Sequence, residues 1–564
     1  MIRRMWLGLR AYFAMFVVLA VFVWSAVYIR LHRAQENPPG TITLRLGHWQ
    51  LESSVRDAFN TLAAEYEKTH PGVRIVQDAI PESTYGQWVS TQLMGGTAPD
   101  IMELSLGLPY QIWLSYYNRY FVPMTRYVNR PNPYNVGTDL EGVPLRNTYK
   151  DGMRTSYIDE MQEYINIPLA QFGVRIFYNR DLLRRLTGLE QAPLEYRTFL
   201  EVCRRIGKLK DLKGRNYIAI AGSAYHIGMW ESMMADPLTY GGLKRVDFNR
   251  DGFAGNDETF VAFKSGRVDL HYPPYAAKFK MMWELTEHFQ TGYTGLTRDE
   301  AVMLFAQQRA VFMSTGTWDA RSLEQQAKGR FDIGVMEFPL PTQDDPEFGP
   351  FMEGRVYERP QSGFPFGVTR TSQHVDVAID FLLFLASKKQ NQHLNQIIGW
   401  IPAIQGTEMD PLLKAFEPHL VGVYTGMNLQ LGGETWIKWM QVYSLFQVRQ
   451  ITFEQLVAAF EPFYKERGLL DFLEIQKDWR RGMQINEQFL AGIRARALAA
   501  ANPVGADWVK YRALTASRMV MPEIDHANQM RLVEKGPAPD AVGPYEYSSN
   551  VLARVKARLA AERR

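Results

Sequence analysis

The sequence predicts an α/β protein built from more than one lobe, and three observations support this prediction. Two β-strand patterns, at 42–46 and 73–76, enclose an amphipathic helix pattern. A strand, a tight turn and a helix follow one another again at 310–323. At 564 residues, the chain is also longer than a single domain usually is. Strands that alternate with helices are typical of α/β folds with a parallel sheet.

The first pattern is a βαβ unit. Residues 42–46 alternate between apolar and polar side chains, as a half-buried strand does. The helix after it carries its apolar residues on one face and stops at His70-Pro71-Gly72, directly before the second strand. Similar patterns predict further helices at 85–94, from 181 and at 379–386, and further strands at 101–104, 174–178, 217–221, 310–314 and 331–338.

The stretch from Phe305 to Pro341 contains the most informative aromatic residue. A strand at 310–314 is followed by the turn Thr315-Gly316-Thr317, by Trp318 and by a helix from Asp319. Ligands of open α/β sheets bind at the carboxyl ends of the strands. A large aromatic ring at that edge suits an apolar face such as that of a sugar ring. The alternative is that Trp318 belongs to the core.

Composition excludes several classes of protein. The net charge of +3 is too balanced to indicate a nucleic-acid partner. The single cysteine, Cys203, rules out an intrachain disulfide and a cysteine zinc cluster. The sequence contains no G-x-S-x-G, H-E-x-x-H or P-loop motif, so we expect no catalytic residues.

The N-terminus predicts a membrane anchor. Three arginines precede an apolar run at 11–29, which is near the length needed to cross a bilayer and is flanked by aromatic residues. Residues 35–40 then form a short spacer. We expect an uncleaved single-pass anchor in the cytoplasmic membrane, with the body on the periplasmic or outer side. A cleaved signal peptide is the alternative.

Residues 247–258, DFNRDGFAGNDE, match the calcium-loop pattern D-x-[DN]-x-[DN]-G-x₅-E at every defined position. Calcium takes six to eight oxygen ligands, and this spacing supplies them around a turn made by glycine. The alternative is an acidic surface loop without metal. The expected ligands of a structural Ca²⁺ are Asp247, Asn249, Asp251, the carbonyl of Phe253 and Glu258, with Asp257 as a further carboxylate.

Several motifs, in order along the chain, resemble the family 1 extracellular solute-binding proteins, in the carbohydrate-binding branch that includes maltose-binding protein. They are Gly96-Thr97-Ala98-Pro99-Asp100, Tyr178-Asn179-Arg180-Asp181-Leu182, Gly316-Thr317-Trp318, Ile333-Gly334 with Pro339-Leu340-Pro341, the helix around 378–387, and Gly399-Trp400-Ile401-Pro402. Some relatives that take acidic oligosaccharides carry a comparable calcium loop.

The resemblance implies a two-lobed periplasmic-binding-protein fold, with a hinge and an inter-lobe ligand cleft that closes on a carbohydrate. It also implies an ABC permease as partner and a monomeric binding body. The expected parts are an anchor and spacer (1–40), lobe 1 (41–164 and 339–386), lobe 2 (165–338 and 387–470) and a helical C-terminal extension (471–564).

The resemblance also selects the residues expected to contact ligand. Trp318 matches the family's principal stacking residue, and Tyr178 matches a tyrosine that touches ligand. Trp436, which precedes the helix opened by Thr452, resembles a second stacking tryptophan. The other expected contacts are Trp49, Glu52, Glu103, Trp113, Trp230 and Trp400.

Two features depart from the family pattern, namely the anchor and about a hundred residues beyond the family's usual end. The extension contains an amphipathic pattern at 471–500 and a basic helix pattern near 554–564, which is either a solvated helix or a surface for anionic lipid or the permease. The leading hypothesis is a tethered sugar-capturing component of an importer. The alternatives are a ligand sensor that docks on a membrane receptor and a glycan-processing enzyme.

Overall fold

The computed structural model describes residues 40–535 except 105, 106, 109, 503 and 518–521, together with residues 20, 21, 23 and 24. These residues form two compact units, each assembled from three segments of the chain. Unit 1 comprises Met1–Leu145, Ile165–Ile167 and Phe364–Ile397, and unit 2 comprises Arg146–Tyr164, Pro168–Gly363 and Ile398–Arg564. The fold is therefore a two-lobed mixed α/β fold in which the chain passes repeatedly between lobes.

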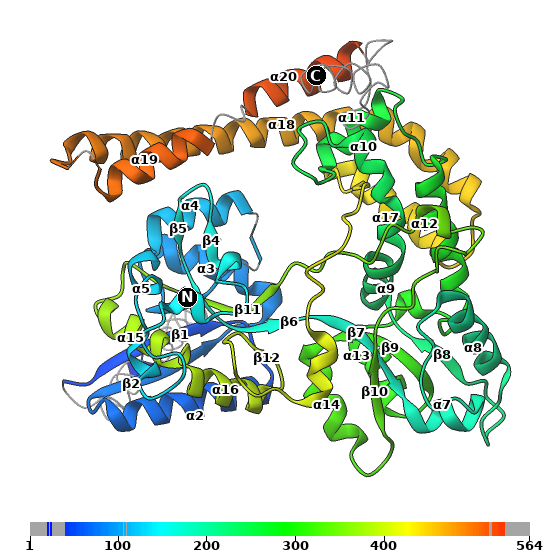
Figure 1. Ribbon diagram of the computed structural model, residues 1–564, viewed down its shortest axis with the longest axis horizontal. Helices are drawn as coiled ribbons and strands as arrows, with labels where there is room; N and C mark the ends of the chain where they lie inside the picture. The colour runs from blue at the N-terminus through cyan, green and yellow to red at the C-terminus, as the bar shows by residue number, and fades with distance from the viewer. Residues whose placement is uncertain are drawn as a thin grey trace, which may run out of the picture. The chain divides into compact units, whose positions relative to one another are not determined.

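The sheet of unit 1 contains the expected βαβ unit. Strand β1 pairs in parallel with β2, Leu46 opposite Gln77, and with β3, Leu46 opposite Ile101. Strand β11 pairs antiparallel with β3, which gives the order β11-β3-β1-β2. Helices α2 and α16 lie on one side of these strands and α3 on the other (Figure 1). The elements are β1 (Ile42–His48), α2 (Ser53–Thr69), β2 (Val73–Ala79), α3 (Glu82–Gly95), β3 (Ile101–Glu103), α4 (Tyr110–Tyr120), α5 (Thr125–Val128), β11 (Gln361–Val368), α15 (Val375–Leu385) and α16 (Lys388–Ile398).

Unit 2 contains a four-stranded sheet in the order β10-β7-β9-β8. Strands β8 and β9 are parallel, whereas β7 is antiparallel to both β9 and β10. Its strands and the helices around them are β7 (Val174–Asn179), α7 (Arg180–Thr187), α8 (Tyr196–Lys208), β8 (Ile218–Ala221), α9 (Ala224–Trp230), α10 (Leu243–Val246), α11 (Asn256–Lys264), α12 (Pro273–Thr286), α13 (Arg298–Ala306), β9 (Ala310–Gly316), α14 (Thr317–Ala327) and β10 (Ile333–Met336). Two further strands, β6 (Ile167–Phe172) and β12 (Ile401–Pro402), pair antiparallel with each other and are not part of this sheet. The small hairpin of β4 (Tyr157–Ile158) and β5 (Glu163–Tyr164) also belongs to this unit.

The C-terminal part of unit 2 is helical. Its elements are α17 (Gly433–Gln447), α18 (Phe453–Ala499), α19 (Ala506–Ser517) and α20 (Pro522–Lys535). The 47-residue α18, orange in Figure 1, begins at a capping box in which Thr452 and Gln455 bond reciprocally, as the helix start at Thr452 predicted. Helix α19 packs against α18, and α20 packs against α11.

The described boundaries differ from the expected ones at several places. The first segment of unit 1 ends at Leu145 and not at Tyr164, and residues 165–167 belong to unit 1 and not to unit 2. The chain returns to unit 1 at Phe364 and not at Pro339, and unit 1 extends to Ile397 and not to Ala386. Helix α16 stays with unit 1 because Asn135 Oδ1 accepts from the Lys388 backbone N–H at 2.8 Å. No boundary exists at Asp471, which lies within α18 and accepts hydrogen bonds from the backbone and hydroxyl of Thr435 at 2.9 and 2.6 Å.

The predicted anchor at 11–29 lies almost wholly outside the described residues, as does the basic helix pattern near 554–564. Among the residues that are described, no helix combines the length and the apolar character needed to cross a membrane.

Candidate functional site

The carboxyl edge of the unit 1 sheet gathers Trp49, Gln50 and Glu103. Trp49 and Gln50 directly follow β1 and Glu103 ends β3; the two strands run in parallel and therefore finish at the same edge. The Trp49 ring is half-buried and meets the Tyr85 ring edge-on at a centroid distance of 5.1 Å. The Tyr85 hydroxyl donates to the Glu103 carbonyl at 2.7 Å. The edge thus presents an indole ring whose orientation is fixed by a buried tyrosine.

Glu103 is a buried carboxyl group with one oxygen uncommitted. Its Oε1 accepts from Gln50 Nε2 at 2.9 Å, and its Oε2 has no hydrogen-bond partner among the described residues. Burial raises the pKa of Glu103 to about 8, and the nearby Glu52 charge raises it further, against the hydrogen bonds from Gln50 and the Trp49 backbone. At neutral pH the group is therefore mostly protonated and can donate through its O–H.

The two other predicted contacts of unit 1 lie in different surroundings. Glu52 is exposed at the start of α2 and makes no side-chain cap there. Trp113, on α4, is 2% exposed and stacks on Tyr117 at 5.5 Å, so little of its ring is open to a ligand.

In unit 2, parallel strands β8 and β9 end side by side, and Trp318 lies in the first turn of α14 directly after β9. Strand β9 runs to Gly316 and α14 starts at Thr317, so the expected separate turn at 315–317 is absent. Asp319 fixes the first turn of α14, because it accepts from the Thr315 hydroxyl at 2.5 Å and from the guanidinium of Arg298.

Trp318 belongs to an aromatic group formed by Phe172, Trp318 and Trp400. The Phe172 ring meets Trp318 at 5.8 Å and Trp400 at 6.0 Å, both in edge-to-face geometry. All three side chains are only partly buried. The Trp318 indole N–H has no partner among the described residues. The indole N–H is itself buried, so the group offers partly exposed apolar ring faces, which suit the C–H face of a sugar ring.

The remaining predicted contacts lie in apolar clusters of unit 2. Trp230 is fully buried against Phe199 and Phe338, so its position is that of a core residue and not of a ligand contact. Tyr178 is 5% exposed, and its ring packs where a β-carbon at Gly334 would stand. Trp436, on α17, is partly buried and packs against the apolar cluster that contains Phe260, Trp439 and Phe460.

Two residues of the candidate site were missed by sequence reasoning. Gln50 lies between the predicted Trp49 and Glu52, and Phe172 ends β6. No strand was predicted to end at Phe172, so its place beside Trp318 became visible only in the structure. No local signal marked Gln50, since its role depends on the distant Glu103.

The loop at 247–258 has the geometry of a cation site. Carboxylate oxygens of Asp247, Asp251 and Glu258 lie within 4.8 Å of one another. Asp247 is fully buried and Glu258 is 2% exposed, and burial with neighbouring carboxylates raises the pKa of Glu258 to about 8. Gly252 adopts a φ of +89°, as the turn position of a calcium loop requires. Two buried carboxylates and the exposed Asp251 thus offer oxygen ligands of the kind that Ca²⁺ takes.

The other expected ligands differ in their present roles. Asn249 Oδ1 accepts from the Asp251 backbone N–H at 2.8 Å, inside the loop. The Phe253 side chain is exposed and its ring contacts Tyr424. Asp257 is 8% exposed and is not one of the three clustered carboxylates.

A second group with metal-ligand side chains is already neutralised by arginine. Glu337, Glu358 and His419 approach one another closely, but the buried Arg175 donates to Glu337 at 3.2 Å and to Glu358 at 3.1 Å. These residues therefore form an ion-pair network.

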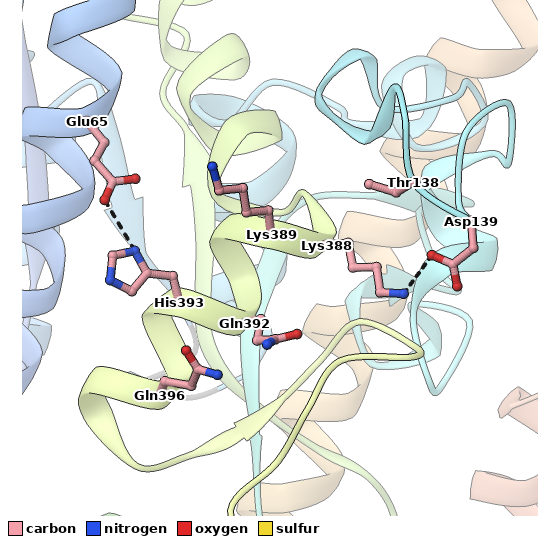
Figure 2. Close-up of a pocket in the computed structure, with 8 residues that line it drawn as sticks. All are labelled: Glu65, Thr138, Asp139, Lys388, Lys389, Gln392, His393 and Gln396. Carbon is pink, nitrogen blue, oxygen red and sulfur yellow. Dashed lines mark hydrogen bonds and ion pairs between the residues drawn. The ribbon is translucent and has the colours of Figure 1, made fainter.

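A polar cavity of about 680 Å³ lies in unit 1, away from the predicted contacts. Figure 2 shows it between α2, the loop at 138–139 and one face of α16. Two ion pairs frame it, Lys388 with Asp139 at 2.6 Å and His393 with Glu65 at 3.3 Å. None of the residues that line it belongs to the expected ligand site.

Comparison with known proteins places the chain in one family. The model of the bacterial extracellular solute-binding protein family matches residues 52–392, and the chain belongs to this family. The chain is 18% identical over 350 residues to the multiple sugar-binding protein of Streptococcus mutans serotype c, covering 61% of this chain and 72% of that protein. Membership makes the chain a solute-binding protein and not an enzyme, as predicted.

Solved structures share the two-lobed fold at low identity. A chitin oligosaccharide binding protein superposes with a TM-score of 0.51 at 16% identity, over 76% of this chain and 99% of its own. The solute-binding protein RafE in complex with raffinose superposes with a TM-score of 0.52 at 16% identity, over 75% of this chain and 99% of its own. The sugar-binding protein MalE from Xanthomonas citri superposes with a TM-score of 0.51 at 15% identity, over 78% of this chain and 99% of its own. At these identities the likeness establishes the fold.

Proposed function

We propose that this chain binds a carbohydrate, and specifically an oligosaccharide, as the solute-binding component of an ABC importer. The observation that carries the proposal is the aromatic group of Phe172, Trp318 and Trp400 at the carboxyl edge of unit 2. The fold supports the same reading, since the similar structures are named for chitin oligosaccharide and raffinose.

The candidate residues of unit 1 and of unit 2 offer different kinds of contact to a sugar. Indole and phenyl faces cover the C–H side of a sugar ring, and polar groups bond its hydroxyls. In unit 2 the partly buried rings of Phe172, Trp318 and Trp400 supply the apolar faces. In unit 1 Trp49 supplies a ring, and the protonated Glu103 and its partner Gln50 are polar groups close behind it. The proposal includes closure of the two lobes on the ligand.

The proposal extends to location and partner. An apolar run at 11–29 tethers the body to the cytoplasmic membrane, on the outer side, where the chain delivers its ligand to the permease. Membership of a bacterial extracellular family supports an extracytoplasmic body.

The loop at 247–258 is part of the proposal as a structural Ca²⁺ site. Asp247, Asp251 and Glu258 would hold the ion, with Asn249 and the Phe253 carbonyl completing the oxygen set. A bound ion supplies the positive charge that these buried carboxylates need.

The experiment that tests the proposal is thermal melting of the purified chain with neutral and acidic oligosaccharides. A ligand that binds only the folded state raises the Tm, by about 2.7 kcal/mol of stability at a hundredfold excess over Kd. A rise with one class of sugar, but not with amino acids or polyols, identifies the cargo. A rise with peptides or polyols and none with any sugar would overturn the carbohydrate assignment.

The second candidate function is a sensor that docks on a membrane receptor, and a different assay distinguishes it from an importer component. An importer component stimulates the ATPase activity of its reconstituted permease when its sugar is present. A chain that binds sugar, leaves ATP hydrolysis unchanged and is encoded beside a kinase would favour the sensor.

A further inference from the structure

Three aromatic rings from separate parts of the chain form a second aromatic row in unit 2, which shares no member with the group around Trp318. Tyr424 lies in the segment that leads from β12 to α17, yellow in Figure 1. Its ring meets the Phe253 ring at a centroid distance of 4.8 Å and the Tyr357 ring at 5.1 Å. All three residues belong to unit 2, so the row is a feature of a single lobe.

The row is open to solvent. The Phe253 side chain is 55% exposed, and both tyrosines are only partly buried. A tyrosine combines an apolar ring with a hydroxyl group that donates and accepts hydrogen bonds. The row therefore offers ring faces for the C–H side of a sugar and two hydroxyl groups for its polar edge.

The two tyrosines are held in place by backbone hydrogen bonds between their segments. The Tyr357 backbone N–H donates to the Val423 carbonyl at 2.9 Å, and the Val423 N–H donates to the Arg355 carbonyl at 2.9 Å. Gly422 permits this approach, because a β-carbon there would lie 2.5 Å from the Arg355 carbonyl oxygen. Rings fixed before a ligand arrives lose less conformational freedom when they bind it.

The buried Arg175 ties both segments to the sheet of unit 2. From β7 it donates to Glu358, which follows Tyr357, at 3.1 Å, and to the carbonyl of Glu417 at 2.9 Å. Strand β7 pairs with β9, whose carboxyl end leads directly to Trp318. The row and the group around Trp318 are thus built on the same two strands.

One short segment also leads from the row to the first aromatic group. It begins at Tyr357 and ends at Gly363, where a β-carbon would lie 2.6 Å from the Trp400 ring. Six residue steps span at most about 22 Å, even when the chain is fully extended. An oligosaccharide of several units is long enough to cover that distance.

We infer that Phe253, Tyr357 and Tyr424 form an additional sugar subsite, which stacks the far units of a long oligosaccharide while a nearer unit occupies the group around Trp318. The inference rests on the proposed carbohydrate function and deepens it, because it assigns long oligosaccharides as the preferred ligand class. Tyr424 is the central residue, since its ring contacts both of the others.

The test is calorimetric titration of the full chain with oligosaccharides that increase in length from dimer to hexamer. The probes are the chitin, xylan and starch series, together with any other sugar that raises the Tm in the melting experiment. We expect the affinity of the parent to rise by about tenfold or more from the shortest bound member to the hexamer, because each added stacked ring contributes a factor of several.

Two variants remove the row and one matched variant serves as control. Tyr424→Ala and Tyr357→Ala should bind the shortest ligand as the parent does and lose the tenfold gain with length. Tyr511→Ala, a partly buried tyrosine of α19, should keep that gain. Trp318→Ala should weaken binding at every length, so it separates the first aromatic group from the row.

A measurement on the parent needs no substitution and therefore reports even where a variant fails to fold. Hydrogen exchange in the peptide that contains residues 419–424 should slow more with the hexamer than with the shortest bound sugar, both at saturation. Lobe closure occurs with either ligand, so the difference reports contact with the row.

The outcomes separate the inference from the proposed function. A parent whose affinity does not rise with length overturns the subsite and leaves sugar binding standing. The same holds if both tyrosine variants keep the gain, or if they lose affinity equally at every length. A chain that binds no sugar removes the proposed function and the subsite with it.

Discussion

The indole ring of Trp318 folds back over Gly316, so closely that a β-carbon at position 316 would lie 2.3 Å from it. The glycine is therefore part of the candidate site, because no other residue leaves room for the ring in this orientation. The neighbouring Asp319 accepts hydrogen bonds from Thr315 and Arg298, and these bonds also fix the first turn of α14.

Replacement of Trp318 by alanine should weaken sugar binding by about tenfold or more, since one stacked aromatic ring contributes more than about 1 kcal/mol. Calorimetric titration measures the change, and circular dichroism checks that the fold is intact. Trp479→Ala, on α18 with 51% of its side chain exposed, is the matched control and should bind as the parent does. Unchanged affinity in the Trp318 variant would remove this residue from the site.

The variant Gly316→Ala tests the same ring without removing it. The added methyl group displaces the indole, so ligand affinity should fall although every aromatic residue is still present. Tryptophan fluorescence should report the displacement. Gly492→Ala, on α18 with open space around it, is a control for the substitution itself. Full affinity in Gly316→Ala would mean that the orientation of Trp318 does not matter for binding.

Glu103 should make stability depend on pH. Its pKa is about 8 in the folded chain, against an ordinary value near 4.5, so between these values the folded state binds a proton that the unfolded state has released. Its contribution to the free energy of unfolding is therefore greatest below pH 4.5 and is lost as pH rises towards 8, by at most about 1.4 kcal/mol per pH unit. Urea unfolding of the parent and of Glu103→Gln across this pH range measures the contribution of Glu103. If the free energy of unfolding depended on pH in the same way in both proteins, the prediction would be wrong.

Arg175 should be the most costly arginine to remove from unit 2. It is fully buried in β7, donates to Glu337 and Glu358, and also bonds the carbonyls of Ala415 and Glu417 at 2.6 and 2.9 Å. Arg175→Ala leaves these acceptors unpaired and should lower the free energy of unfolding by about 3 kcal/mol.

The matched control for that measurement is Arg180→Ala. Arg180 forms an exposed pair with Asp332, whose loss should cost less than about 1 kcal/mol. Equal losses in the two variants, measured by urea unfolding, would show that burial of the Arg175 network contributes no additional stability.

Calcium should stabilise the chain through Glu258. Chelation is expected to lower the Tm of the parent, because the buried carboxylates of the loop lose their counter-charge. In Glu258→Gln the Tm should no longer respond to calcium or to EGTA. Asp269→Asn, outside the loop, controls for the loss of an acidic residue. A parent chain indifferent to both reagents would argue for an acidic loop without metal.

The sequence by itself determined the local elements. Alternation and apolar faces predicted the βαβ unit of 42–79, now seen as β1, α2 and β2, and the strand-to-helix passage that places Trp318 at a sheet edge. The reason is that periodicity and turn residues act over a few positions. The spacing of residues 247–258 likewise predicted which carboxylates would cluster, since a single tight loop sets their separation.

Tertiary structure decided what depends on residues distant in the chain. The pKa of Glu103 follows from burial and from Gln50, and Trp230 is a core residue because Phe199 and Phe338 enclose it. Helix α18 continues through residue 471 because α17 holds Asp471, and α20 joins unit 2 because Gln529 and Leu532 find buried partners there. These outcomes arise from long-range packing and desolvation, which local patterns do not encode.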